Sequence, residues 1–181
     1  RLWNNDLTGW NLAGMNLTDS EFFYATLTNT DFTNADVRGA GFASTTDSGF
    51  TAAQLYSTAS YQTGDLTGIR LARYNLTGWN FAGQNLTGAN FRVAVLSGAD
   101  FTDADLTDAV VTGIRLNETT SRGFSQEQLV STASYQAKNL KGIKLSQNDL
   151  TGWDFNGQDM SNSYLSHANL TGADLGGAKL T

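Results

Sequence analysis

Cysteine and proline are both absent from this chain of 181 residues. Without cysteine there is no disulfide framework, no thiolate metal site and no cysteine nucleophile. The absence does not by itself identify a compartment, so cytoplasmic and exported locations both stay open. Histidine occurs once, at His167, and has no second histidine or cysteine with which to complete a metal site or a catalytic triad.

Long apolar runs are also absent. No run approaches the roughly 20 apolar residues that a bilayer-spanning helix needs. The first ten residues, RLWNNDLTGW, lack the basic start and apolar centre of a signal peptide. We therefore expect a soluble protein with no membrane span.

Positive charge is scarce, with 11 Lys and Arg against 17 Asp and Glu and a formal net charge of −6. Nucleic-acid binding draws its affinity from clustered Lys and Arg, so direct binding is not expected, whereas basic partners stay open. No GxSxG turn, no phosphate-cradling GxxxxGK[ST] loop and no dinucleotide-binding GxGxxG motif is present. The sequence therefore predicts a protein that is not an enzyme and that binds no metal or cofactor.

What the sequence does contain is a five-residue repeat. From Asn75 to Leu96, in NLTGWNFAGQNLTGANFRVAVL, a Leu or Phe stands at every fifth position. The spacing fits neither the helical period near 3.6 nor the strand period of 2, so the chain must turn a corner every five residues. The same spacing runs through residues 2–42, 66–116 and 140–180.

Two inserts interrupt this spacing, at residues 43–65 and 117–139, and they are copies of each other. The first contains GFTAAQLYSTASYQ, starting at Gly49, and the second contains GFSQEQLVSTASYQ, starting at Gly123. In the first, Thr51 can cap a helix while Gln54 returns the bond, and Phe50 precedes the cap as in a hydrophobic staple. The second copy repeats this pattern, so each insert predicts one short helix.

These helices are expected near residues 50–62 and 124–136. The tetrapeptide LTGW occurs in all three runs, at Leu7, Leu76 and Leu150. Aligned on it, the chain begins and ends partway through a unit. We therefore expect a piece of a longer repeat array.

The repeat pattern A-[DN]-L-x-x resembles the signature of the pentapeptide-repeat family, with close matches in ANFRV, ADFTD, ADLTD, ADVRG, ANLTG and ADLGG. The resemblance covers the whole chain apart from the two inserts. It implies an all-β fold, a right-handed quadrilateral parallel β-helix in which each pentapeptide forms one face and four make a coil. The central Leu or Phe and the small residue two places before it would point inward. Residues 1–181 would then be one solenoid domain with two short α-helical inserts.

Larger residues replace the small inward residue at several positions: Trp10, Met15, Ile69, Tyr74, Trp79, Gln84, Trp153 and Gln158. We predict that each helix takes the place of part of a coil and that Trp79 and Trp153 fill the space beneath it. Away from the inserts, coils of four pentapeptides would stack like on like, for example Phe81 over Phe101. An uncapped β-helix exposes a strand edge at each end, so end-to-end self-association of this piece is expected.

Acidic residues are concentrated in GADFTDADLTDA, which contains Asp100, Asp103, Asp105 and Asp108. They could form an anionic strip that imitates a phosphate backbone or holds a hard cation such as calcium. Alternatively, their carboxylates bond to backbone amides in turns. We favour turn bonding, because one coil away Asp100 and Asp105 would stack on neutral asparagines.

The hexapeptide STASYQ is identical at residues 57–62 and 131–136. Its tyrosines, Tyr61 and Tyr135, either pack against the rod or serve as exposed aromatic anchors for a partner. Structural reuse in a helix that packs on the rod is the favoured interpretation.

The favoured function is non-enzymatic, a rigid spacer or protein-interaction scaffold of a bacterial protein, with a partner that the sequence does not identify. The alternative, which the family resemblance implies, is a DNA-mimicking protein that binds a type II topoisomerase such as gyrase. That function calls for a continuously acidic rod, and Asp100, Asp103, Asp105 and Asp108 are the residues that would serve it. The acidic density of this sequence is modest by comparison.

Overall fold

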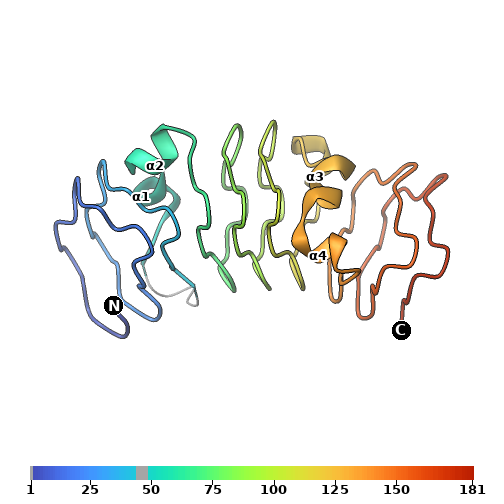
Figure 1. Ribbon diagram of the computed structural model, residues 1–181, viewed down its shortest axis with the longest axis horizontal. Helices are drawn as coiled ribbons and strands as arrows, with labels where there is room; N and C mark the ends of the chain where they lie inside the picture. The colour runs from blue at the N-terminus through green and yellow to red at the C-terminus, as the bar shows by residue number, and fades with distance from the viewer. Residues whose placement is uncertain (1, 44–48) are drawn as a thin grey trace.

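The chain forms an elongated stack of coils with two pairs of short helices on its side (Figure 1). The computed structural model describes residues 2–43 and 49–181. Arg1 and residues 44–48, which belong to the first predicted insert, lie outside the described residues. The two termini lie at opposite ends of the stack (Figure 1).

Each regular coil consists of four pentapeptides. Parallel bridges join a residue to the one four pentapeptides later, such as Asn80 with Asp100 and Asn85 with Asp105. Across each insert the bridged partners lie nine positions further apart in the sequence, as in the bridge from Gly41 to Arg70. An insert therefore lengthens the coil that holds it without disturbing the register on either side.

The prediction of an all-β protein needs one correction. Within residues 2–43 and 49–181 the structure has isolated parallel bridges and no extended strand. Each face is only five residues long, so corners leave a single residue free to bridge to the next coil. The stack is a solenoid held by one bridge per face.

Each corner requires a left-handed backbone at the second residue after the core position. Gly78 and Gly88, which occupy such corners, have φ of 70° and 67°. Before the core position an Asn or Asp bonds to the turn, as where Ala82 N–H donates to Asn80 Oδ1 at 2.8 Å. The side chain satisfies a turn amide that has no coil partner, which explains why Asn and Asp recur there.

Buried ladders of Leu and Phe run along the axis of the rod. The rings of Phe81 and Phe101 stack at 5.7 Å with their planes 17° apart, as predicted. Backbone bonds such as Leu86 N–H to Asp105 O, at 2.8 Å, hold successive coils together. The ladders merge into one continuous hydrophobic core.

In the described part of each insert there are two short helices where the sequence predicted one. The helices are α1 (Ala52–Tyr56), α2 (Ala59–Gln62), α3 (Gln126–Ser131) and α4 (Ala133–Gln136), with a 3-10 turn, η1 (Thr120–Arg122), before α3. The helix is broken at Thr58 and Thr132, whose backbones are extended and whose hydroxyls accept from the N–H groups of Tyr61 and Tyr135. An internal cap in STASYQ therefore splits each helix into two.

The helices replace two faces of a coil. In the first insert Gln54 Nε2 donates to Leu27 O and Thr30 O, both at 2.8 Å, and Ser57 O accepts from Asn34 N–H. Thr30 O and Asn34 N–H belong to the coil below and would otherwise pair with a further coil, whereas Leu27 O also accepts from Thr30 N–H within its own turn. The helix pair thus sits on the faces of Leu27 and Phe32.

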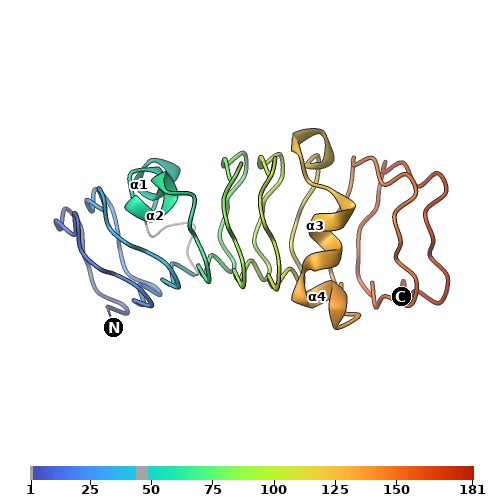
Figure 2. The ribbon, with the colours of Figure 1, turned by 45° about the horizontal axis from the view of Figure 1, so that its top comes forward.

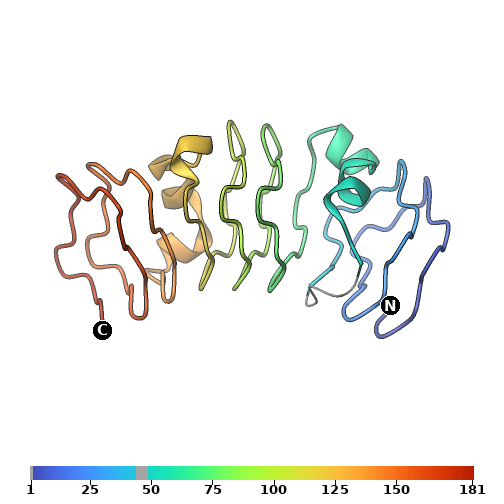
Figure 3. The same cartoon turned by 180° about the vertical axis from the view of Figure 1, so that it is seen from behind.

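The second helix pair is turned by one face around the rod axis. Gln128 Nε2 donates to Phe101 O and Ala104 O, so this pair lies on the faces of Phe101 and Leu106. Phe101 continues the ladder of Phe32 through Phe81, so only one of the two faces is shared with the first pair. Between equivalent points of the two copies the chain comprises one lengthened insert coil and nine pentapeptides, which make two coils and one extra face. Turning the view brings α3 and α4 to the front while α1 and α2 stay at the upper edge (Figure 2), and the reverse view shows both pairs from behind (Figure 3).

Candidate functional site

The four predicted acidic residues occupy two different roles in the turns. Asp100 and Asp105 precede core residues, and each accepts a hydrogen bond from a turn amide, from Thr102 N–H at 3.0 Å and from Thr107 N–H at 2.9 Å. Asp103 and Asp108 stand at the left-handed corner positions, with φ of 55° and 58°. The carboxylates of Asp100 and Asp105 thus satisfy turn amides, whereas Asp103 and Asp108 serve the coil through their backbone conformation.

The environment keeps two of these carboxylates ionised. Bonds from the backbone N–H and the hydroxyl of Thr102 lower the pKa of Asp100, and bonds from Thr107 do the same for Asp105. As predicted, Asp100 and Asp105 bridge to the neutral Asn80 and Asn85. The negative charge therefore does not continue along these two rows into the preceding coil.

Within residues 2–43 and 49–181, no group of three or more acidic or histidine side chains is placed to hold a metal ion. His167 is exposed at a corner, with φ of 61°. None of the helices in these ranges is long and apolar enough to cross a bilayer.

Both predicted tyrosines contact the coil that follows their insert. Tyr61 donates its hydroxyl proton to Asn80 O at 3.0 Å, and Tyr135 donates to Asp154 O at 2.9 Å. Tyr135 is 8% exposed, and burial raises its pKa. Tyr56, which has no tyrosine counterpart in the second copy, lies 4.4 Å from the ring of Tyr61. These are the contacts expected of tyrosines that pack against the rod.

Two of the three tryptophans of the LTGW motifs lie against a helix pair. Trp79 is partly buried and lies 6.2 Å from Phe50, and Trp153 is 7% exposed and lies 5.8 Å from Phe124. Trp10, in the first coil, is 51% exposed. Trp79 and Trp153 therefore fill the space against the insert, as predicted, from the coil that follows it.

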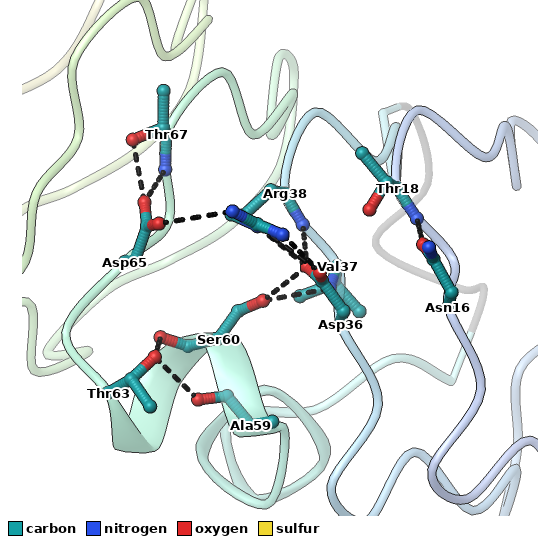
Figure 4. Close-up of polar contacts among 10 residues, drawn as sticks. All are labelled: Asn16, Thr18, Asp36, Val37, Arg38, Ala59, Ser60, Thr63, Asp65 and Thr67. Carbon is teal, nitrogen blue, oxygen red and sulfur yellow. Dashed lines mark hydrogen bonds and ion pairs between the residues drawn. The ribbon is translucent and has the colours of Figure 1, made fainter.

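A charged cluster beside α2 was not predicted from the sequence (Figure 4). Arg38 pairs with Asp36 and lies 3.6 Å from Asp65 Oδ2, so one guanidinium joins two carboxylates from neighbouring coils. Ser60 of α2 donates to Asp36 Oδ1 at 3.0 Å and accepts from Val37 N–H at 2.9 Å. The hydrogen bond from Arg38 holds the pKa of Asp36 well below its ordinary value.

This cluster distinguishes the first insert from the second. The positions equivalent to Asp36, Arg38 and Asp65 are Val110, Thr112 and Asn139. Beside the cluster is an open hollow of about 430 Å³, lined by Thr18, Asp19, Arg38, Gly39, Asp65, Thr67 and Gly68. Sequence reasoning missed the cluster because Asp36 and Asp65 become neighbours only through the lengthened register of the insert coil.

A second hollow, of about 710 Å³, lies between α3 and the following coil, with Phe124 and Trp153 among its lining residues. The matching hollow of the first insert measures about 310 Å³. Tyr74 lines that smaller hollow at the position held by Asn148 in the second copy. Both hollows border the contact between a helix pair and the coil after it.

The family model for pentapeptide repeats matches eight copies in this chain, over residues 6–39, 75–113 and 139–177. The chain belongs to the pentapeptide repeat family. The matched ranges lie almost entirely within the coils, and they leave out both helix pairs, as the repeat spacing leads one to expect. None of the curated proteins compared by sequence matches the chain.

One solved structure shares the fold. A trypsin-treated form of QnrB1, a plasmid-mediated fluoroquinolone resistance protein, matches with a TM-score of 0.54 and 20% identity, covering 99% of this chain and 91% of that one. HetL, involved in heterocyst differentiation regulation in the cyanobacterium Nostoc, matches with a TM-score of 0.29 and 19% identity, covering 98% and 90%. At 20% identity the likeness to QnrB1 concerns architecture alone.

Proposed function

We propose that this pentapeptide repeat protein is a non-enzymatic interaction scaffold that presents two helix pairs at a fixed separation and a fixed angle. The observation that carries the proposal is that each helix pair is hydrogen-bonded to the coils on both of its sides. Each pair is bonded to the coil below it, through Gln54 or Gln128, and to the coil above it, through Tyr61 or Tyr135. A helix pair held on both sides moves with the rod.

The surface chemistry is consistent with this role. Asp100 and Asp105 carry pKa values lowered by turn hydrogen bonds, which is a structural use of a carboxylate rather than a site poised for proton transfer. The polar side chains of the rod repeat from coil to coil. Partner recognition would then depend on the helix pairs, the part of the rod that departs from the repeat.

The scaffold proposal is tested by the distance between the helix pairs. Because the chain contains no cysteine, Gln62→Cys and Gln136→Cys introduce two clean labelling sites at equivalent exposed positions of α2 and α4. Pulsed electron–electron double resonance on the spin-labelled protein should give one narrow distribution of distances between the two labels. A broad or bimodal distribution from a folded sample would contradict a rigid scaffold.

A second candidate function is binding to gyrase as a DNA mimic. Its support is the exposure of Asp103, Asp105 and Asp108 on one coil together with a fold shared with QnrB1. The test is gyrase supercoiling of plasmid DNA titrated with this protein at low and physiological salt. Inhibition at submicromolar protein that weakens with salt, and that is lost when Asp103, Asp105 and Asp108 are changed to Asn, would support mimicry. No effect at tens of micromolar would reject it.

A further inference from the structure

The coil that follows each insert carries three side chains that hold the helix pair from above. Their positions are the inward small positions of three successive faces, occupied by Tyr74, Trp79 and Gln84 after the first insert and by Asn148, Trp153 and Gln158 after the second. Each of the six contacts its insert, and the contacts at the second and third positions are equivalent in the two copies.

The first position holds the start of the insert. Asn148 is 3% exposed, its Oδ1 accepts from the N–H groups of Thr119 and Thr120 at 2.8 and 3.0 Å, and its Nδ2 donates to Leu116 O at 2.7 Å. In the first copy the Tyr74 hydroxyl donates to Phe50 O.

The second and third positions hold the helices themselves. Trp153 packs on Phe124 at 5.8 Å, and Trp79 on Phe50 at 6.2 Å. Gln158 Nε2 then donates to Tyr135 O at 3.2 Å, and the equivalent amide in the first copy makes the equivalent bond. The three positions together cover the length of the insert.

Coils that lie against another coil use small residues at these positions. The coil after the first insert is followed by one with Ala89, Ala94, Ala99 and Ala104, all of which are buried. The reason is steric, because stacked coils are only about 4.8 Å apart and leave no room for an indole. An inward Trp therefore marks a coil whose N-terminal neighbour is a helix pair, whereas the smaller Ile114 fits over Ala94 within stacked coils.

The N-terminal coil has the residues expected of a coil next to a helix pair at all three inward positions. Asn5, Trp10 and Met15 align with Asn148, Trp153 and Gln158, and the stretch 2–10 is identical to the stretch 145–153 at seven of its nine positions. Here, however, the three side chains are exposed, Trp10 by 51% and Met15 by 48%. Asn5 donates to Trp3 O, two residues away, in place of the backbone of an insert.

We propose that the N-terminal coil is a docking face for a helix pair of the α3–α4 type, joined to it from the N-terminal side of Arg1. The occupant follows from the interface already present twice in the chain, in which a Phe before a Ser or Thr cap meets the Trp. The connection follows from the same two examples, in which the insert precedes its coil by the same interval, from Phe50 to Tyr74 and from Phe124 to Asn148. A second coil stacked end to end is disfavoured, because Trp10 and Met15 occupy the space it needs.

The test grafts the missing neighbour onto the complete chain. Residues 97–143, one coil with its insert, are placed directly ahead of Arg1, so that Ile143 precedes Arg1 as it precedes Lys144. With 5-fluorotryptophan incorporated, the fluorine resonance of Trp10, assigned with Trp10→Phe, should lose its shift between H₂O and D₂O. The resonances of Trp79 and Trp153 serve as internal references and should not change.

The matched control is the same chimera with Phe124→Ala in the grafted copy only, in which Trp10 should keep at least half of its solvent shift. As an independent readout, Asn5→Ala, Trp10→Ala and Met15→Ala combined in the chimera should speed tryptic cleavage within the grafted insert at least tenfold. If Trp10 stays exposed to solvent next to a folded graft, the proposal is overturned. Equal protection from a free peptide of residues 117–139 would overturn the connected arrangement. Either failure would leave the scaffold proposal intact, since that depends on the two existing helix pairs.

Discussion

At the scale of the residue, the corners of the coils limit which side chains the rod tolerates. Most left-handed corners carry Gly, Asn or Asp, but Val93 has φ of 61° with a β-branched, 48% exposed side chain. A left-handed backbone costs an ordinary residue about 1–2 kcal/mol, and a β-branched residue is poorly suited to it.

We expect Val93→Asn to stabilise the protein by about 1 kcal/mol, because Asn tolerates the left-handed region and loses little packing at an exposed position. Chemical denaturation measures the change. Gly88→Val is the reverse control, since a Cβ there meets open space and only the backbone penalty remains. A Val93→Asn variant less stable than the parent would show that the corner is not strained.

The Arg38 cluster makes part of the stability dependent on pH. Asp36 has a lowered pKa in the folded chain, so its carboxylate stabilises the fold above its unfolded pKa near 4. That contribution is lost as the pH falls through the still lower folded pKa. Because Asp36 and Arg38 are 27% and 48% exposed, the pair should contribute about 0.5–1 kcal/mol.

Asp36→Asn should therefore lower the free energy of unfolding by about 0.5–1 kcal/mol at pH 7, with a difference that shrinks as the pH falls below 4. Urea denaturation across pH 2–7 measures this. Asp103→Asn is the matched control, because Asn tolerates the left-handed corner that Asp103 occupies. A difference independent of pH would assign the effect to packing.

At the scale of the element, the helix pairs depend on one buried threonine each. Thr132 is fully buried, its hydroxyl donates to Leu129 O at 2.7 Å, and it accepts from Tyr135 N–H at 3.2 Å. The residue thereby ends α3 and begins α4. Within residues 117–139, all of which the structure describes, no other hydroxyl performs both functions.

Thr132→Val should destabilise the protein by about 1–2 kcal/mol, because it keeps the shape while leaving the N–H of Tyr135 without its capping acceptor. Thermal unfolding followed by circular dichroism measures the loss. Thr58→Val should cost a similar amount, whereas Thr171→Val, at an exposed turn, should stay within about 0.5 kcal/mol of the parent. Equal losses at Thr132 and Thr171 would argue against the capping role.

Some features of the coils and helices could be predicted from the sequence, and others could not. Local signals sufficed for the coil of four pentapeptides, the Phe81–Phe101 stack and the Thr51–Gln54 cap, since each depends on residues at fixed short spacings. These local signals did not predict that the helix breaks at Thr132, or that Asp36 and Asp65 lie close together. Both depend on how the insert sits on a coil distant in sequence, and spacing alone cannot supply that.

At the scale of the whole molecule, the number of pentapeptides between the inserts sets the angle between the helix pairs. Deleting residues 92–96 removes one face and keeps the five-residue spacing from Phe91 to Phe101. The second pair should then lie on the same faces as the first. With spin labels at positions 62 and 136, the lateral offset disappears and the distance should shorten.

Duplicating residues 87–106 is the control, since it adds a complete coil. The angle should stay unchanged while the separation grows by about 4.8 Å, the spacing of stacked strands. A deletion of five residues that leaves the distance unchanged in a folded protein would show that the register does not determine where the helices point.

The lengthened insert coil, which leaves its neighbours in register, also bears on how such a gene can change. Gaining or losing a helix pair lengthens or shortens one coil by nine codons, and the compensating changes are confined to the inward residues of the coil that follows. An insertion or deletion of five codons changes the angle between the helix pairs. One of twenty codons changes the distance between them. Insertions and deletions in the gene can therefore change the number of helix pairs, the angle between them and the distance between them separately. The Leu and Phe ladders of the core stay in place through each change.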